Sequence, residues 1–472
     1  MKNDMISILI KALSSSFDPK YRIIYNFILQ KIRNNELVAG QKLPPHRQLA
    51  AQIFVTSVTV SRAYKELEKS GAIITCVGKG SFVRDNSLNT ENQGVFHNFR
   101  GEGSFFDLSR SSSILTNSVA PILQTFFETQ RETKLITSLL SNSIVDSPLS
   151  EYGPELGHQH HREAGLRWLS LSGVDATNEQ ITCTNGAQHA LLCAILIATN
   201  SGDTIISESF TYPGVIQLCR QLGRKLVGLA YDEYGLLPDA LAHFCQCNTC
   251  SALYLSPQIH NPTGTVMPCQ RRLELIDICR QYNIIILEDD VFGVLHPQRE
   301  KPLQFYAQER TLLFSSLSKI AMPGLRAGYL VFPSALRSKA TNVLRDTCWM
   351  ASPLSHQAAT ELINSGAAFS LLAHLRQEIV RRKACVEELL SNFTYSTSQY
   401  CPHYYIEMPK NKSATHISTK LHERGVSVMS SESFAVSMQD KHRFVRASVS
   451  AVHDNNALVQ AFKTLKECIE EN

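Results

Sequence analysis

The sequence has no long hydrophobic run. No stretch of its 472 residues approaches the roughly 20 consecutive apolar residues that a membrane-spanning helix needs. The first residues, MKNDMISILIKALSSSF, carry an acid in their charged head and lack the long apolar core of a secretory signal peptide. We therefore expect a protein without a membrane anchor that stays in the cytoplasm.

The cysteines also lack the pattern that is typical of a disulfide framework. The 13 cysteines are odd in number and scattered, and several lie inside apolar runs, as Cys193 does. This distribution favours reduced, buried thiols over a disulfide framework. Cys245, Cys247 and Cys250 gather beside His243 but lack the paired spacing of structural zinc sites, so we expect no metal.

The whole chain has only a small excess of positive charge, but this charge is distributed unevenly along the sequence. Charged residues make up 19% of the chain, and the net charge is only +4. Residues 1–84 nevertheless hold 13 Lys and Arg against 5 Asp and Glu, a net charge of +8, whereas the remainder carries −4. At roughly 100 to 200 residues per domain, the length also implies more than one domain. A basic module thus precedes a larger, mildly acidic body.

The basic module has the pattern of three helices followed by a hairpin. Apolar residues at helical spacing predict helices over residues 19–35, 46–54 and 58–71, and two short β runs flank the turn GKG at residues 78–80. This order predicts a winged helix-turn-helix, whose third helix enters the major groove of duplex DNA while Lys79 neutralises phosphate. On charge alone, a three-helix module with a solvated charged face is an equal alternative.

The module resembles the DNA-binding domain of GntR-type regulators through the stretches LVAGQKLPPHRQLAAQ, TVSRAYKELEKSGAI and GKGSFV. The resemblance implies that the Arg of the second helix, the polar start of the third helix and nearby cations contact DNA. The implied residues are Arg47, Thr56, Ser57, Thr59, Arg62, Lys65 and Lys79. Phe54 stands where the family usually has Gly in the turn, and Ser57 stands where Arg is frequent, so the operator sequence cannot be inferred.

The segment after the module is polar and rich in Asn and Gly. Residues 85–104, DNSLNTENQGVFHNFRGEGS, have no sustained apolar period, which is typical of a linker. The predicted organisation is a DNA-binding domain over residues 1–84, this linker, and a body over residues 105–472.

The body alternates short apolar β runs with helical stretches. This alternation predicts an α/β fold with a mostly parallel sheet and a site where the strands end. Residues that suit ligand binding follow five of the runs. They are GAQ at residues 186–188, FTYP at 210–213, HNPTG at 260–264, Asp289 with Asp290, and SLSK at 316–319. Taken singly, each of them is more often an ordinary turn or a solvated side chain.

In this order the motifs resemble the fold-type I aminotransferases, which use pyridoxal 5′-phosphate (PLP), across roughly residues 107–470. The resemblance implies that Lys319 carries PLP covalently, that Asp289 pairs with the pyridinium nitrogen, and that Arg446 grips a substrate carboxylate. It also implies that Tyr212 stacks on the ring and that Asn261 bonds the phenolic oxygen. The implied phosphate ligands are Ala187, Gln188, Ser316, Ser318 and Arg326, together with Tyr152, which reaches the phosphate of the neighbouring subunit in a homodimer.

One position departs from the aminotransferase pattern. These enzymes commonly have Tyr three residues after the acid, and this chain has Phe292 in EDDVF. Phe cannot donate to the phenolic oxygen that Asn261 contacts. We therefore expect covalent cofactor binding, and the sequence leaves open whether efficient transamination survives.

The fusion of the two halves resembles the MocR subfamily of bacterial transcription regulators. It implies a PLP-dependent homodimer that binds a double-stranded DNA operator and takes a small amino compound, or PLP itself, as effector. Two alternatives stay open. One is a working aminotransferase whose basic domain only tethers or autoregulates it, and the other is a DNA-binding protein whose body has lost the cofactor and serves for dimerisation.

Overall fold

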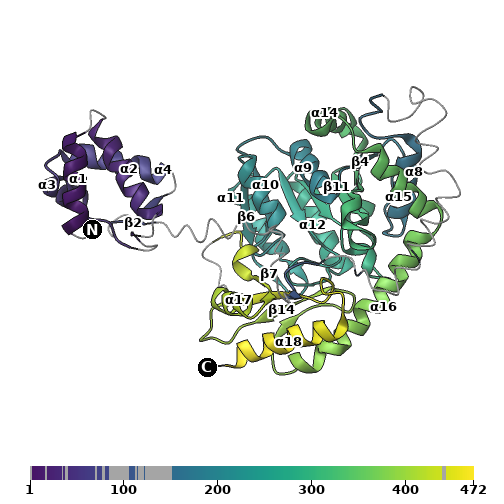
Figure 1. Ribbon diagram of the computed structural model, residues 1–472. Coiled ribbons are helices and arrows are strands. Elements are labelled where there is room, and N and C mark those ends of the chain that lie inside the picture. Colours follow the sequence, from purple (N-terminus) through teal and green to yellow (C-terminus); the bar gives the residue numbers. More distant parts are fainter. Residues whose placement is uncertain are drawn as a thin grey trace. The chain divides into compact units, whose positions relative to one another are not determined.

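The chain in the computed structural model (Figure 1) divides into two units, Met1–Phe99 and Arg100–Asn472, each with its own hydrophobic core. The structure describes residues 3–15, 19–33, 36–37, 41–69, 72–76, 80–83, 106–111, 114, 122, 151–437 and 443–471. The expected linker over residues 85–104 and the wing residue Lys79 lie outside the described residues, although residues 80–83 of the expected wing are described. Among the described helices, none is long and apolar enough to cross a membrane.

The N-terminal unit contains the predicted helices and hairpin, preceded by one helix that was not predicted. Its elements are α1 (Asn3–Ser15), α2 (Lys20–Arg33), α3 (His46–Gln52), α4 (Ser57–Lys69), β1 (Ile73–Cys76) and β2 (Gly80–Val83). β1 and β2 pair antiparallel, as a wing requires.

The apolar stripes of these helices form the core of the unit. Ile24 and Ile28 of α2 and Val60, Ala63 and Leu67 of α4 are fully buried, at the three- and four-residue spacing that aligns side chains on one helix face. α1 joins the same core through Leu9. The polar face of α4 therefore points away from the core.

A seven-stranded sheet organises the larger unit. Its strands lie in the order β4 (Ile181–Thr184), β12 (Gly328–Val331), β11 (Thr311–Ser316), β10 (Ile285–Asp289), β9 (Ala252–Leu255), β5 (Thr204–Glu208) and β6 (Lys225–Leu229). β12 runs antiparallel to both of its neighbours, and all the other pairs are parallel. The prediction of a mostly parallel α/β sheet is confirmed.

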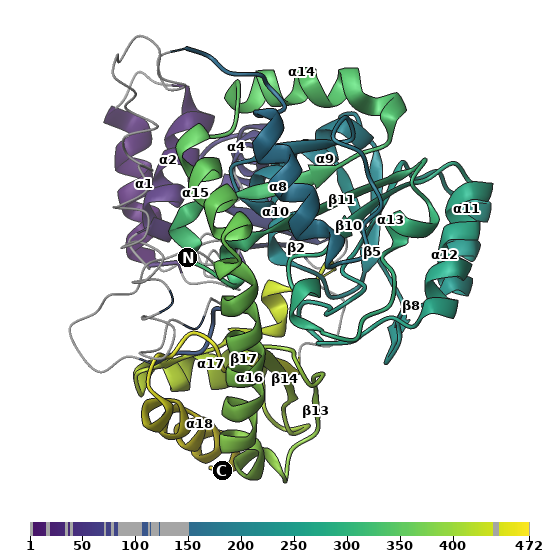
Figure 2. The ribbon, with the colours of Figure 1, turned by 90° about the vertical axis from the view of Figure 1, so that its right-hand side faces the viewer.

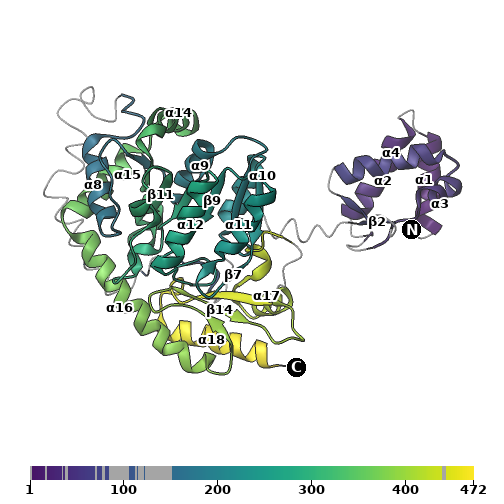
Figure 3. The same ribbon diagram turned by 180° about the vertical axis from the view of Figure 1, so that it is seen from behind.

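Helices cover both faces of this sheet. One face carries α9 (Ala187–Ala198), α10 (Pro213–Gln221) and α14 (Arg337–Cys348), and the other carries α8 (Gln159–Ser170), α11 (Pro238–Cys247), α12 (Cys269–Gln281), α13 (Leu303–Tyr306) and α15 (Pro353–Asn364). Figure 2 shows α8 beside α15, and Figure 3 shows α11 beside α12. Within β11, Leu312 and Phe314 join the core under α9, whereas Leu313 joins the opposite core, because successive strand side chains point to opposite faces.

The C-terminal part adds a smaller sheet under the long helix α16 (Ala367–Glu387) (Figure 1). The sheet consists of β13 (Tyr395–Ser396), β14 (His403–Glu407), β17 (Phe444–Ser448) and β16 (Met429–Ser430). The helices α17 (Ala414–Glu423) and α18 (Asn455–Glu470) belong to the same part. β3 (Phe106–Asp107) pairs with β15 (Val426–Ser427), which places the segment after the expected linker against this part. A short hairpin of β7 (Tyr231–Asp232) and β8 (Gly235–Leu236) follows β6.

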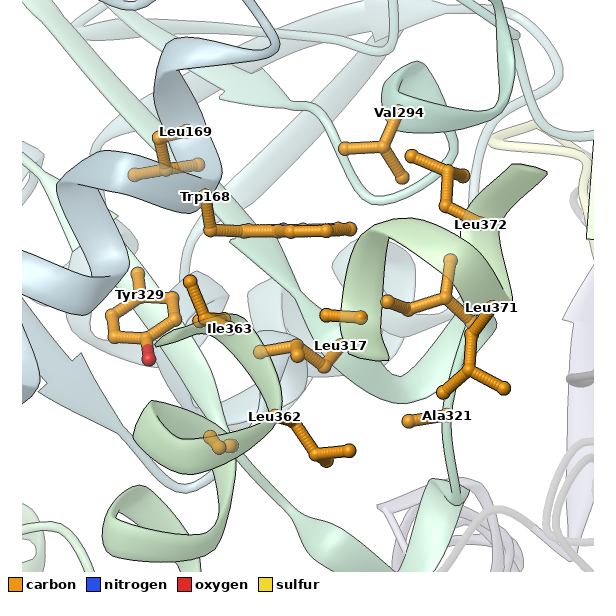
Figure 4. Close-up of a cluster of buried hydrophobic side chains, with 14 of the residues drawn as sticks. Trp168, Leu169, Val294, Leu317, Ala321, Tyr329, Leu362, Ile363, Leu371 and Leu372 are labelled. Carbon is orange, nitrogen blue, oxygen red and sulfur yellow. The ribbon is translucent and has the colours of Figure 1, made fainter. Parts of the chain in front are cut away.

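Apolar side chains anchor the loop that carries Lys319. Leu317 and Ala321 flank this lysine and are fully buried. Figure 4 shows both of them in the cluster that includes Trp168 of α8 and Leu362 of α15. Because packed apolar residues hold both sides of the loop, Lys319 has a fixed place at the end of β11.

Candidate functional site

A groove on the N-terminal unit gathers four of the predicted DNA-contacting residues. Arg47 of α3 lines it together with Ser57, Arg62 and Lys65 of α4, and all four are exposed. The complete lining is His46, Arg47, Ser57, Val58, Ser61, Arg62, Lys65 and Glu66. Three guanidinium or ammonium groups in one groove suit a phosphate backbone.

The two predicted threonines form the start of α4. Thr56 Oγ1 accepts a hydrogen bond from the backbone N–H of Thr59 at 3.3 Å and lies 2.8 Å from Thr59 Oγ1. Thr56 therefore caps the helix. Farther along α4, the guanidinium carbon of Arg62 lies 3.9 Å from the ring centre of Tyr21 on α2, so this arginine stacks on an aromatic ring.

The turn between α3 and α4 contains a left-handed residue. Phe54 has a φ of 56° and is 81% exposed. The backbone thus adopts the region that glycine favours, even though the residue is not glycine. This conformation costs an ordinary L-residue about 1–2 kcal/mol.

In the larger unit, Lys319 lies at the end of β11 and is partly buried. Its Nζ donates to the carbonyl oxygen of Ser111 at 2.6 Å and lies 4.9 Å from the ring centre of Phe292. Burial, assisted by the positive charge of Arg446, lowers the pKa of Lys319 from 10.5 to about 8. A larger share of this lysine is therefore neutral, and hence nucleophilic, at neutral pH than is the case for an exposed lysine.

Asp289 ends the neighbouring strand β10 and is also partly buried. Its Oδ2 accepts from the Tyr254 hydroxyl at 2.7 Å, and its Oδ1 accepts from the backbone N–H of Val291 at 3.0 Å. Burial raises the pKa of Asp289 to about 6. The next residue, Asp290, instead lies 3.5 Å from Arg299 Nη1, so the two adjacent acids have different partners.

Asn261, in the turn that follows β9, meets Arg446 of β17. Arg446 Nη1 donates to Asn261 Oδ1 at 2.7 Å, and Arg446 Nη2 donates to the carbonyl oxygen of Ser109 at 2.5 Å. Because Oδ1 of Asn261 is occupied, its Nδ2 remains the end that can donate to a ligand. Burial lowers the pKa of Arg446 to about 10, so the residue stays charged at neutral pH.

The predicted phosphate ligands converge around the start of α9. Gly186 precedes Ala187 with a φ of 81°, and a Cβ built on it would lie 2.4 Å from Arg326 Nη2. Gly328, which pairs with Ser316, approaches the same backbone, since its Cβ would lie 2.7 Å from the carbonyl carbon of Gly186. The hydroxyls of Ser316 and Ser318 are 2.8 Å apart. A helix N-terminus, a guanidinium group and two hydroxyls therefore come together.

Tyr212 lies close to this group and is held by a second predicted residue. Its hydroxyl donates to Oε1 of Gln188 at 3.0 Å. Burial raises the pKa of Tyr212 to about 12, so the phenol stays neutral. Tyr152, by contrast, lies at the surface, 77% exposed, with its ring centre 5.1 Å from that of Trp349. The role predicted for Tyr152 requires a second subunit.

The sequence did not point to several residues of this site. Tyr254 bonds Asp289, and Ser109 and Ser111 offer carbonyl oxygens to Arg446 and Lys319. Tyr254 could have been identified, because it is the residue with a hydroxyl group in the otherwise apolar run ALYL. The two serines gave no signal, because backbone carbonyls leave no trace in the residue type.

The chemistry of these groups fits PLP. Gly186 has no room for a side chain beside Arg326, which leaves backbone N–H groups and a guanidinium for a phosphate. The buried carboxyl of Asp289 suits a ring nitrogen that carries a proton. Arg446 Nε is buried without a hydrogen-bond partner, so this guanidinium can take a further acceptor.

Each half of the chain matches a known protein family. Residues 133–465 match the family model described as aminotransferase class I and II, and residues 20–83 match that of bacterial regulatory proteins of the gntR family. The uncharacterized HTH-type transcriptional regulator YdeF of Bacillus subtilis is 25% identical over 462 residues, 96% of this chain and 95% of its own. YdcR of Escherichia coli, with the same description, is 26% identical over 473 residues, 96% of this chain and 99% of its own.

Solved structures share the fold of the larger unit. An archaeal alanine:glyoxylate aminotransferase superposes with a TM-score of 0.70 at 19% identity, covering 81% of this chain and 94% of its own. The α-aminoadipate aminotransferase LysN of Thermus thermophilus, solved with N-(5′-phosphopyridoxyl)-L-leucine, gives a TM-score of 0.69 at 18% identity, covering 86% and 98%.

Proposed function

Because this chain belongs to the aminotransferase class I and II family and carries a gntR-type segment, we propose that it is a PLP-binding transcription regulator. In this proposal the N-terminal unit binds a double-stranded DNA operator and the larger unit senses a small amino compound or PLP itself. The observation that carries it is the joint presence, in one chain, of the cationic groove on α3 and α4 and the cluster of Lys319, Asn261 and Arg446 in the larger unit.

Lys319 would hold the cofactor through Nζ. Its pKa of about 8 means that the neutral amine becomes more abundant as the pH rises through that value. The Ser111 carbonyl and the Phe292 ring keep this amine in place at the end of β11. When bound, PLP supplies an aldehyde carbon and an electron-withdrawing ring.

The other residues would bind and orient the cofactor. Asp289 would pair with the ring nitrogen and Tyr212 would lie against the ring. Asn261 would donate from Nδ2, because Arg446 already holds its Oδ1. The phosphate would bind at the start of α9 beside Ser316, Ser318 and Arg326.

An effector would bind at the same residues. Its amino group would take the place of the Lys319 amine, and Arg446 would bind a carboxylate with two nitrogens, a task that suits a guanidinium. Such a ligand changes DNA binding only if its affinity differs between two arrangements of the protein. We place this regulator in a homodimer, in which the exposed Tyr152 would reach the neighbouring subunit.

A working aminotransferase is the second candidate, since the fold is that of such enzymes. Phe292 weighs against it. Its ring faces Lys319 at 4.9 Å and carries no hydroxyl that could hold a proton on the cofactor. Rapid keto-acid formation from common amino acids, with DNA binding indifferent to them, would favour the enzyme.

A PLP titration of the full chain tests the proposal. We expect the purified protein to develop the visible absorbance of lysine-bound PLP, and the absorbance to vanish in Lys319→Ala because the attached amine is gone. Lys339→Ala, at an exposed position of α14, serves as the matched control and should behave as the unchanged protein.

The same proteins should then be used to select DNA from a random duplex library, with and without PLP and amino compounds. A selected site whose affinity changes with PLP in the unchanged protein, but not in Lys319→Ala, supports the regulator. If PLP gives no absorbance and Lys319→Ala changes nothing, the protein is instead a DNA binder whose larger unit has lost its cofactor.

A further inference from the structure

Val58 is the one aliphatic side chain that lines the groove of the N-terminal unit. It lies in the first turn of α4 and is 75% exposed. The other lining residues are His46, Arg47, Ser57, Ser61, Arg62, Lys65 and Glu66, all of which are polar or charged. A single apolar residue on a protein surface is common, so its exposure alone means little. Its place among groups that suit a nucleic acid is what requires an explanation.

The fold does not need Val58. The stripe that packs α4 against the core contains Val60, Ala63 and Leu67, which are fully buried and face away from the groove. A β-branched residue also lowers helix propensity slightly, because its χ1 rotamers are restricted in a helix. Val58 therefore exposes apolar surface to water with no gain for the helix or the core.

Neighbouring side chains of α4 are engaged within the protein. The hydroxyls of Thr56 and Thr59 lie 2.8 Å apart at the helix cap, and the guanidinium of Arg62 stacks on Tyr21 at 3.9 Å. These contacts direct the three polar groups toward the helix start and toward α2. Val58 lies next to Ser57 in the first turn of α4, and its side chain is exposed to solvent.

The position of Val58 on the helix fits contact with base edges. Residues 58, 61, 62 and 65 lie three or four apart and so share one face of α4. Arg47 and Lys65 place cations on either side, where they can hold phosphates. In the major groove, thymine alone among the four bases presents a methyl group, and aliphatic side chains contact it.

We propose that Val58 reads a thymine of the operator through contact with its 5-methyl group. This inference rests on the proposed DNA-binding function and adds to it a base preference at one position. The contact buries two apolar groups that water otherwise surrounds, which gives a favourable free energy without a hydrogen bond. The operator therefore contains a thymine at the position that faces the first turn of α4.

The test removes one methyl group at a time. Full-length protein selects its preferred duplexes from a random-sequence library, and each thymine of the selected site is then replaced singly by deoxyuridine, which lacks only the methyl. We expect one replacement to weaken binding by the unchanged protein about fourfold, the value of one buried methyl group. The same replacement should not affect Val58→Ala.

Val380→Ala is the matched control, because it makes the same change at an exposed position of α16 in the other unit. It should respond to deoxyuridine as the unchanged protein does. The inference is overturned if no thymine is sensitive, or if Val58→Ala keeps the same sensitivity. A selection that yields no sequence preference would overturn both the inference and sequence-specific DNA binding, whereas a selected site without a methyl effect overturns the inference alone.

Discussion

Phe54 holds a left-handed conformation with 81% of its side chain exposed, so the strain has little packing in return. Glycine adopts this conformation without the cost of about 1–2 kcal/mol that other residues meet, although it adds flexibility to the unfolded chain. We expect Phe54→Gly to raise the free energy of unfolding of the N-terminal unit by about 0.5–1 kcal/mol. Urea unfolding followed by circular dichroism measures this change.

Asn283→Gly provides the comparison for Phe54. Asn283 also has a left-handed φ, of 53°, but asparagine tolerates that region better than phenylalanine does. Its replacement should therefore gain less stability. If Phe54→Gly destabilises the unit, the aromatic side chain makes a contact that outweighs the backbone strain.

At the same scale, the sequence identified the reactive groups but not their environment. Lys319 and Asp289 could be named because each ends an apolar strand inside a recognisable motif. The depressed pKa of Lys319 depends on burial and then on Arg446, and the hydrogen bond from Tyr254 to Asp289 crosses between strands. Such contacts follow from tertiary packing, which residue order alone does not specify.

The start of α9 is the element on which phosphate binding depends. A Cβ on Gly186 would meet Arg326 Nη2 at 2.4 Å, so Gly186→Ala must push the guanidinium away. We expect this variant to lose PLP affinity by at least about tenfold, which corresponds to the loss of one charge-assisted hydrogen bond. Titration of PLP absorbance measures the affinity.

Gly202→Ala separates the steric effect from the backbone effect. Gly202 has a similar φ of 89°, but no atom lies within 4 Å of a Cβ built there. Both variants should lose about 1 kcal/mol of stability from the left-handed conformation. Equal PLP affinity in the two variants would mean that Arg326 does not hold the phosphate.

For whole elements, periodicity predicted most of what the structure contains. The helices of the basic module and the alternating strands of the body have clear repeats, and both are present. α1 was not predicted. The antiparallel direction of β12 could not be inferred, because the residue pattern of a strand does not specify its direction in the sheet. The pairing of β3 with β15 joins segments far apart in the chain and has no local signal.

At the scale of the molecule, the charge division predicts two different responses to salt. Residues 1–84 carry +8 and the rest −4, so DNA binding releases counterions. We expect operator affinity to fall steeply between 50 and 200 mM salt, with a slope of log affinity against log salt that Arg47→Ala reduces by about 0.9. Fluorescence anisotropy of labelled operator measures it.

PLP binding is the internal control for this experiment. Arg446 is buried and Lys319 is partly buried, so salt screens their charges much less than those of the groove. PLP affinity should therefore change little over the same range. If Arg47→Ala leaves the salt slope unchanged, Arg47 does not contact a phosphate.

The segment 106–111 has a consequence for how strongly any ligand can bind. Its carbonyl oxygens at Ser109 and Ser111 already occupy the charged ends of Arg446 and Lys319. A ligand that takes both positions must release the main chain, and the free energy of that release is subtracted from its affinity. By thermodynamic reciprocity, any interaction that strengthens these two main-chain contacts weakens ligand binding, and the ligand weakens that interaction by the same factor.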